Sequence, residues 1–307
     1  MNYLNKKRKY NQVNTGFIAV LVCFLSLSFS ISCSSDVEDK TDFITIGTFN
    51  IAWLGDGIDD TNPRSEKDYN NIADIIINSG ADIIGLEEIE NDDALRKLTK
   101  YLDDYSFFVG NESGSQNPAI LYKSSLQLKQ LKYIYELEVE PNKTKPGLLF
   151  EVKKGNFDWL MMVVHFKSTS RYDSTDELEE QSRILRSQQA EALSSWIDST
   201  LGISTEKDLI IVGDFNDYPA RKTNPTLISL VENKNIEFLT SEMKSCKYEY
   251  LYSIDHILVS KSAKQRYLSN SIRMYNFFNA LTSLEAEKIS DHCPVLATFN
   301  ISKHDND

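Results

Sequence analysis

Proline, glycine and cysteine are all sparse in this sequence of 307 residues. It has seven prolines, twelve glycines and four cysteines, with 41% hydrophobic and 25% charged residues. This composition excludes collagen-like, low-complexity and wholly disordered chains and leaves little room for long flexible linkers. The two cysteines beyond residue 33, Cys246 and Cys293, are too few for a disulfide framework. The sequence leaves open whether they form one bridge or remain two separate thiols.

Positive charge is also in short supply. The chain has 33 Lys+Arg against 45 Asp+Glu, a formal net charge of −12. An acidic surface repels phosphate backbones at long range, so we exclude a protein that coats nucleic acid tightly. An enzyme that touches nucleic acid briefly, with a metal ion at the contact, remains compatible with this charge.

Several widespread catalytic strings are missing. The sequence has no HExxH, no paired CxxC, no GxSxG, no GxxxxGK and no GxGxxG. A zinc site is therefore disfavoured. Serine-hydrolase, P-loop and dinucleotide-binding functions have no support.

The amino terminus differs from the rest of the chain. Residues 6–9 are all basic, and an apolar run of 15 residues follows at 17–31, too short for a membrane span but typical of a signal peptide. Small Ser32 precedes Cys33, as in a lipoprotein signal whose cysteine becomes the lipidated first residue. We predict a signal peptide at 1–32 and a polar acidic tether at 33–41. A plain secreted protein and an uncleaved anchor helix are the alternatives.

The prediction for localisation is an exported protein, lipid-anchored to the cell envelope, with exposure at the cell surface left open. Removing the signal peptide takes four positive side chains and no negative ones from the chain, which changes the net charge from −12 to −16.

The remaining chain alternates between strand and helix patterns. Apolar runs bounded by turn residues predict strands at 43–51, 82–86, 119–122, 148–152, 159–166, 209–212, 254–259 and 295–301. Apolar periodicity predicts helices at 69–77 and 175–201. Closely spaced strand signals at 106–166 indicate antiparallel hairpins. We therefore predict one layered domain with helices and sheets at 42–302, followed by a polar tail at 303–307.

Polar residues end or interrupt many of these apolar runs. Burying carboxylates is unfavourable by several kcal/mol unless they have a partner, so a recurrent pattern of this kind suggests a shared one. Oxygen ligands favour a hard divalent cation. The residues are Asn50, Glu87, Glu88, His165, Asp214, Asn216, Asp255, His256, Asp291 and His292.

Six short strings carry a resemblance to a known family. The sequence resembles the endonuclease/exonuclease/phosphatase superfamily, closest to exported bacterial nucleases, across 43–301. The resemblance implies an α/β four-layer sandwich, in which two mostly antiparallel sheets pack face to face with helices outside. The strings, in order, are TFNI at 48–51, GLEEI at 85–89, VHF at 164–166, GDFND at 213–217, IDHIL at 254–258 and SDHCPV at 290–295.

The resemblance also implies a metal site. Glu88 would be the main ligand of Mg²⁺ or Mn²⁺, with Ca²⁺ compatible as an additional ion. Asn50 and Asp291 would help to hold the ion or its waters.

Catalytic roles follow from the same motifs. Asp214 and Asn216 would bind or orient the attacking water and a phosphate oxygen. His292 would contact the phosphate or act as base, with Asp255 fixing its tautomer. His165 matches the histidine of the deoxyribonuclease branch, a candidate acid toward the leaving oxygen.

Other residues near the motifs have weaker assignments. Lys167 and Arg171 are candidate contacts for the substrate phosphate. Glu87 replaces a common Gln and is not expected to be a ligand, and His256 is expected to be structural. Gln116-Asn117 stands where some nucleases carry an acidic or arginine residue, which leaves the support of His165 unexplained.

The leading functional prediction is an exported metal-dependent phosphodiesterase, a nuclease acting on DNA or RNA. Nucleic acid would be its substrate and the membrane its contact through the N-terminal lipid, with no obligate protein partner. The alternatives are a lipid phosphodiesterase or phosphatase on the same fold, and a catalytically silent surface module. Sphingomyelinases often carry an exposed aromatic hairpin for membrane contact, for which the string YNFF at 275–278 could be mistaken.

Overall fold

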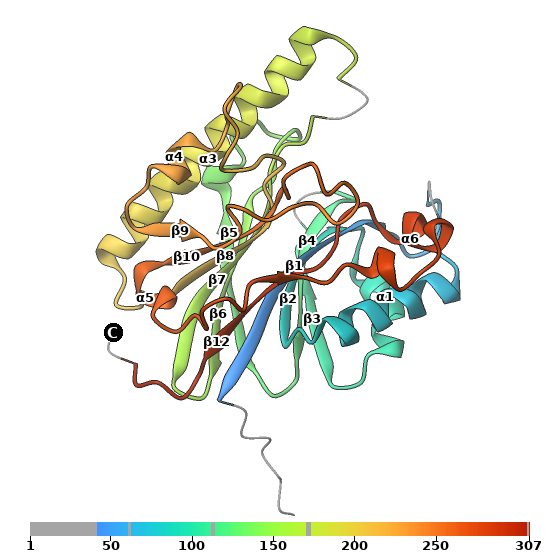
Figure 1. Ribbon diagram of the computed structural model, residues 1–307, viewed down its shortest axis with the longest axis horizontal. Helices are drawn as coiled ribbons and strands as arrows, with labels where there is room; N and C mark the ends of the chain where they lie inside the picture. The colour runs from blue at the N-terminus through green and yellow to red at the C-terminus, as the bar shows by residue number, and fades with distance from the viewer. Residues whose placement is uncertain (1–41, 61–62, 112–113, 170–172, 306) are drawn as a thin grey trace, which may run out of the picture. The chain divides into compact units, whose positions relative to one another are not determined.

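Two six-stranded β-sheets form the centre of the computed structural model, with helices on their outer faces (Figure 1). Sheet A has the strand order β11 (Arg273–Met274), β12 (Val295–Asn300), β1 (Phe43–Leu54), β2 (Ile83–Ile89), β4 (Asn117–Lys123) and β3 (Tyr105–Val109). Sheet B has the order β5 (Gln127–Ile134), β6 (Gly147–Lys154), β7 (Phe157–His165), β8 (Leu209–Asp214), β10 (Asp255–Ser260) and β9 (Ile236–Phe238).

Each sheet contains one parallel pair, β1 with β2 and β7 with β8, and its other pairs are antiparallel. The predicted sandwich of two mostly antiparallel sheets between helices is therefore confirmed.

The structure describes residues 42–60, 63–111, 114–169, 173–305 and 307, which belong to one compact unit. The predicted signal peptide at 1–32, the tether at 33–41 with Cys33, and Arg171 lie outside the described residues. Within the described part of the chain, no helix combines the length and apolarity that a membrane crossing requires.

The outer layers are helical. Sheet A is covered by α1 (Glu66–Ser79), α2 (Asp92–Leu98) and α6 (Ser283–Ile289), and sheet B by α3 (Asp176–Ile203) and α4 (Ile228–Val231). A short α5 (Lys261–Lys264) and the 3₁₀ turns η1 (Thr99–Tyr101), η2 (Tyr135–Leu137) and η3 (Phe277–Asn279) complete the elements. Helix α1 starts where Ser65 and Asp68 form a reciprocal capping box, which satisfies free N–H groups of the first turn. It ends at Gly80, whose left-handed backbone (φ 73°) suits glycine.

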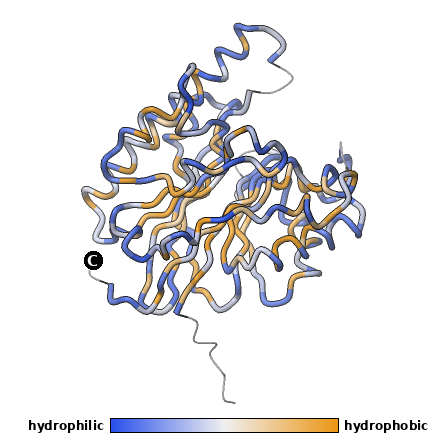
Figure 2. Tube along the Cα trace, in the orientation of Figure 1, coloured by the Kyte–Doolittle hydropathy of each residue, from blue (hydrophilic) through white to orange (hydrophobic). Residues whose placement is uncertain are grey.

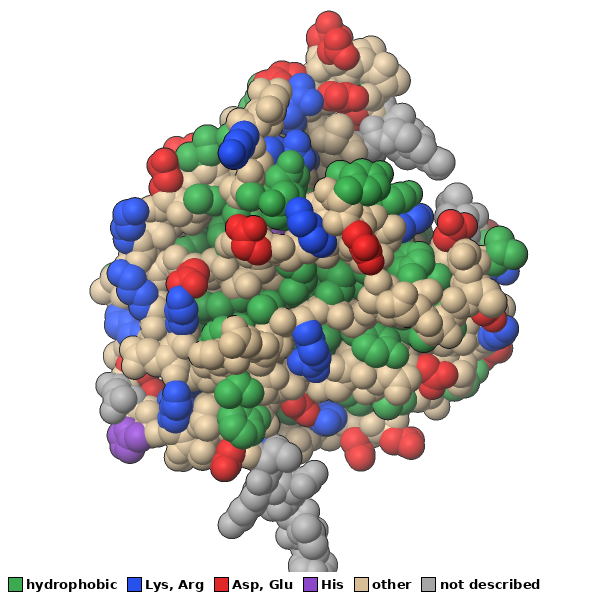
Figure 3. Space-filling view, in the orientation of Figure 1, with side chains coloured by type: hydrophobic (Ala, Val, Ile, Leu, Met, Phe, Trp, Pro, Cys, Tyr) green, Lys and Arg blue, Asp and Glu red, His purple; other side chains and the backbone are tan. Residues whose placement is uncertain are grey.

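Alternation along the strands creates three apolar layers. On β8, Ile210 and Val212 face the other sheet, whereas Leu209 and Ile211 face the layer under α3. The strands are accordingly mostly hydrophobic, while the helices mix both kinds of residue (Figure 2). On the face drawn in Figure 3, acidic and basic side chains are interspersed.

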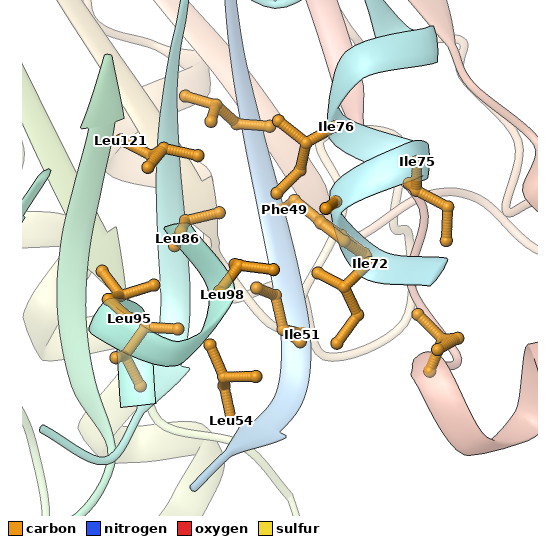
Figure 4. Packing of buried hydrophobic residues seen from close by; sticks show 14 of the residues in the cluster. Phe49, Ile51, Leu54, Ile72, Ile75, Ile76, Leu86, Leu95, Leu98 and Leu121 are labelled. Atoms are coloured by element: carbon orange, nitrogen blue, oxygen red, sulfur yellow. The ribbon is translucent and has the colours of Figure 1, made fainter. Parts of the chain in front are cut away.

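The layer under α1 and α2 is densely apolar. Phe49 and Ile51 of β1 meet Ile72 and Ile76 of α1, and Leu98 of α2 lies beside Ile51 (Figure 4). Burial of such side chains contributes about 1.5–3 kcal/mol each. This packing fixes the outer face of β1, so its other face is held toward sheet B.

The two sheets approach each other closely at Gly85 of β2. A Cβ atom at this position would lie 2.7 Å from Cγ2 of Val212 and 3.1 Å from both methyl groups of Val163. A side chain there would push the sheets apart, so glycine is needed for their close contact.

Candidate active site

Neighbouring strands of sheet B present three polar side chains in one row. His165 ends β7, Asp214 ends β8 and Asp255 begins β10, and the strand register pairs Asp214 with both of the others. Each lies two residues from an apolar side chain that faces sheet A, so period-two alternation turns all three inward. All three are buried.

Irregular strand ends in sheet A place the facing group. The β1–β2 pairing shifts register between Asn50 and Leu54, and the β2–β4 pairing shifts between Leu86 and Ile89. Glu88 lies in this second irregularity with a φ of 64°. Bulges redirect side chains. Here the bulge turns the Glu88 carboxylate toward His165, whose Nε2 lies 3.9 Å from its Oε1.

Asn50 connects the two sheets. Its Nδ2 donates to Oδ2 of Asp214 at 3.1 Å and to Oε1 of Glu88 at 3.4 Å. Its Oδ1 accepts from the backbone N–H of Ala52 at 2.9 Å, which fixes the orientation of the amide. In this orientation Asn50 holds both carboxylates from its NH₂ end.

His292 is oriented by a carboxylate. Its Nδ1 lies 2.9 Å from both oxygens of Asp255, and its backbone N–H donates to Oγ of Ser290. Burial disfavours the charged imidazolium, but the carboxylates of Asp255, Asp214 and Asp291 outweigh this and raise the pKa of His292 well above its usual range. Ser290 in turn donates to the Asn50 carbonyl, which ties the loop to β1.

Asp214 is fixed by hydrogen bonds on both oxygens. Oδ1 accepts from the backbone N–H of Asn216 at 2.8 Å, and Oδ2 accepts from Asn50. Burial, with a smaller contribution from the nearby Asp255, raises the pKa of Asp214 to about 7, while His292 opposes the shift. Asn216 has a left-handed backbone (φ 53°) and donates its side-chain N–H to the Phe166 carbonyl.

Lys145 also belongs to the site, although no sequence pattern predicted it. Its Nζ lies 3.3 Å from Nδ1 of His165 and donates to the Gln116 carbonyl at 2.6 Å. Burial lowers the pKa of Lys145 to about 8, although the carboxylates of Glu88, Asp214 and Glu87 favour its charged form. Burial, the Lys145 charge and His292 hold the pKa of His165 well below its ordinary value. Gln116 donates from Nε2 to Oε2 of Glu88, so it supports Glu88 through its side chain.

The remaining predicted residues lie around this centre. Asp291 is 60% exposed beside His292, with its Oδ1 3.8 Å from Nε2. Lys167 follows β7, and its Nζ donates to the Ser168 carbonyl. Glu87 is fully buried and accepts from Thr48. His256 points to the opposite face of β10, between Thr240 and the Asp217 carbonyl, as expected for a structural residue.

The arrangement is suited to a hard cation. Ligand atoms of Asp214, Asp255 and His292 lie within 4.8 Å of one another, and Glu88 is linked to Asp214 through Asn50. Buried carboxylates at this density need compensating positive charge. The donor set is rich in carboxylate oxygen, which suits a hard divalent cation.

A cavity of about 170 Å³ opens beside Asp255 and His292. One wall is the segment 245–254, which includes Tyr248 and Tyr252. A disulfide joins Cys246 to Cys293, next to His292, so of the two alternatives the bridge is the one found. The ring of Tyr252 stacks on Tyr218 at 5.0 Å.

The chain can be compared with known proteins. The family model described as "Endonuclease/Exonuclease/phosphatase family" matches residues 47–292. No curated relative matches the sequence.

Solved structures share the fold. A humanized TDP2 of D. rerio is 16% identical with a TM-score of 0.56, covering 85% of this chain and 100% of that one. The Bacteroides thetaiotaomicron mannosyl-6-phosphatase Bt3783 is 16% identical with a TM-score of 0.56, covering 83% and 98%. The human Nocturnin catalytic domain, with bound sulfate, is 16% identical with a TM-score of 0.55, covering 84% and 94%.

Proposed function

Because the chain belongs to the endonuclease/exonuclease/phosphatase family, whose members are metal-dependent hydrolases of phosphate esters, we propose that it is a phosphodiesterase that cleaves nucleic acid. The observation that carries this proposal is the meeting of Glu88 from sheet A with Asp214 and the Asp255–His292 pair. No single strand supplies this set.

The proposed metal site centres on Glu88. Asp291 would help to hold the ion or its waters, and Asn50 would do so through the two carboxylates to which its NH₂ group donates. A bound Mg²⁺ or Mn²⁺ would neutralise the charge that develops on the phosphate oxygens. Asn50 donates to both Glu88 and Asp214, so it keeps the ligand and the water-binding carboxylate in one fixed geometry.

Asp214 and His292 are the proposed groups for water and phosphate. Asp214 is held on both oxygens and would orient the attacking water or accept its proton, with Asn216 beside it. Asp255 accepts from Nδ1 of His292, so Nε2 of the ring is left for a phosphate oxygen or a proton. Positioned groups of this kind supply about 10²–10⁴-fold each in rate.

The aromatic cavity favours a nucleic acid substrate. Tyr248 lines the space beside His292 and is exposed, and its flat ring suits a nucleobase attached to the scissile phosphate. The ring of Tyr252 is covered by Tyr218 on one face and by Nζ of Lys244. A D. rerio TDP2 of the same fold was crystallised with a single-strand DNA product. The face drawn in Figure 3 mixes acidic and basic side chains and presents no broad basic surface, so recognition there would rest on the site itself.

The string YNFF at 275–278 gives the lipid alternative no support. Phe277, within this string, is fully buried and packs against Phe49 and Phe278. A buried ring is not available to insert into a lipid surface. We keep the prediction of an exported, lipid-anchored nuclease, with Cys33 as the lipidated residue.

A substrate panel tests the proposal. The protein is assayed with Mg²⁺ or Mn²⁺ on single- and double-stranded DNA, RNA, sphingomyelin, inositol phosphates and mannose 6-phosphate. We expect cleavage of a nucleic acid, its abolition by EDTA, and a loss of at least about 100-fold in Asp214→Asn and His292→Ala.

The matched control is His304→Ala, which removes an exposed histidine far along the chain in the tail and should leave the rate unchanged. If only sphingomyelin or only a phosphomonoester is hydrolysed, the proposed nucleic acid substrate is wrong and the hydrolysed class is the substrate. A protein that binds metal but hydrolyses nothing in the panel would be a silent binding module.

A further inference from the structure

His165 is supported by a cation where the sequence suggested a missing acidic residue. The side chain of Gln116 reaches Glu88, not His165, and Nδ1 of His165 instead faces Nζ of Lys145 at 3.3 Å. A second acceptor, the Gln116 carbonyl at 2.6 Å, holds the same ammonium group. Lys145 therefore lies between two acceptors.

The backbone on both sides of Lys145 is restrained. Thr144 is buried, and its Oγ1 both donates to the Glu140 carbonyl and accepts from the Glu140 N–H, each at 2.9 Å. Pro146 follows and limits the backbone of the residue before it. The ammonium group is thus delivered to His165 by a fixed turn that precedes β6.

This contact determines where the imidazole proton lies. An ammonium group has three donors and no acceptor, so Nδ1 of His165 must present a lone pair to it. The single proton of the neutral ring then lies on Nε2. Nε2 lies 3.8 Å from Oδ2 of Asp214 and 3.9 Å from Oε1 of Glu88.

We propose that Lys145 is a positioning residue, which holds His165 as the neutral Nε2–H tautomer so that an N–H donor faces the phosphate site between Glu88 and Asp214. The role in catalysis rests on the proposed function. A carboxylate at Nδ1 would instead accept a proton from Nδ1. The neutral ring would then have a lone pair on Nε2, or the ring would become a charged imidazolium. With Lys145, His165 binds a phosphate or leaving oxygen by a neutral hydrogen bond.

The tautomer can be measured without turnover. In metal-free protein labelled with ¹⁵N-histidine, we expect His165 to show an unprotonated Nδ1 and a protonated Nε2 at neutral pH, with the signals assigned by their loss in His165→Asn. In Lys145→Met the ring should become a mixture of tautomers, while Lys145→Arg should keep the wild-type pattern. His256 serves as the internal control, since its partners Thr240 and Asp217 are untouched and its signals report on folding.

Kinetics give the second readout. We expect kcat to fall roughly 10- to 100-fold in Lys145→Met with little change in KM, and to recover most of its value in Lys145→Arg. A protonated Nδ1 in the wild-type protein would overturn the proposal by itself, as would an unchanged tautomer and kcat in Lys145→Met. If the predicted tautomer is found but no phosphodiester is cleaved, the proposed function fails while the assignment of the His165 proton stands.

Discussion

Adjacent residues have opposite surroundings at this site. Asp255 faces the space between the sheets, whereas His256, the next residue, packs against Phe215 and Phe238 on the far face of β10. The alternation of strand side chains explains the difference. Two neighbouring polar residues can therefore belong to different parts of the protein, one to the chemistry and one to the core.

His256 should make the stability of the protein depend on pH. Burial lowers its pKa to about 4, from 6.5 when exposed. As the pH falls, the histidine is therefore protonated in the unfolded chain before it is protonated in the folded protein. The contribution of neutral His256 to the free energy of unfolding is fully present above pH 6.5 and is lost as the pH approaches 4. We expect the free energy of unfolding to fall between pH 7 and 4.5 by about 2–3 kcal/mol more in the wild type than in His256→Gln, measured with urea.

The exposed His304 gives the comparison for this measurement. His304→Gln should show the wild-type pH dependence, because its side chain is exposed in the folded protein as well. Equal slopes for wild type and His256→Gln would show that His256 titrates alike in both states.

The sequence predicted those site residues that occur in recognisable strings. Glu88, Asp214, Asp255 and His292 lie at strand ends within such strings, and the structure brings them together. Lys145 lies in a turn that no sequence pattern marks. Its place in the site depends on the contact of its Nζ with His165, 20 positions away. Only the packing of β6 against β7 reveals such a contact.

At the level of elements, every predicted strand is central and every missed strand is at an edge. The eight predicted runs correspond to β1, β2, β4, β6, β7, β8, β10 and β12, whereas β11, β3, β5 and β9 are the four edge strands. Edge strands expose one side, so they carry fewer of the apolar residues that define a strand signal. β5 shows this directly, since only Ile134 among its residues is buried.

The disulfide should stabilise the tyrosine-bearing segment that lines the cavity. It joins residues 47 positions apart. A bridge across a loop of that length reduces the entropy of the unfolded chain, which stabilises the folded protein by about 4 kcal/mol in the chain-entropy treatment. We expect reductant to lower the free energy of unfolding by about 2–4 kcal/mol and to weaken nucleic acid cleavage, because Cys293 adjoins His292.

The control for this experiment is the double variant Cys246→Ala, Cys293→Ala. Its stability should be lower than that of the oxidised wild type and should not respond to reductant. If reductant leaves the unfolding curve of the wild type in place, the bridge does not contribute to stability.

For the whole molecule, the distance between the sheets is the critical dimension. Gly85 allows Val163 and Val212 to approach β2, and the same two sheets supply the facing halves of the site. We expect Gly85→Ala to lower the free energy of unfolding by about 1–3 kcal/mol and to lower kcat, because the sheets must separate. Urea unfolding and initial rates measure the two effects.

Gly202, near the end of α3, provides the control substitution for Gly85→Ala. A Cβ atom there would meet nothing within 4 Å. Gly202→Ala should leave the rate unchanged and raise stability by up to about 1 kcal/mol, because alanine favours a helix. Equal effects of the two substitutions would mean that the sheets adapt without strain.

The pairing of the first strand with the last has a consequence for the making of the protein. β1 lies between β2 and β12, so its hydrogen bonds on one side wait for residues 295–300. His292 lies just before β12, so it reaches the site only when this strand pairs with β1. Completion of sheet A and assembly of the candidate site are therefore one event in folding.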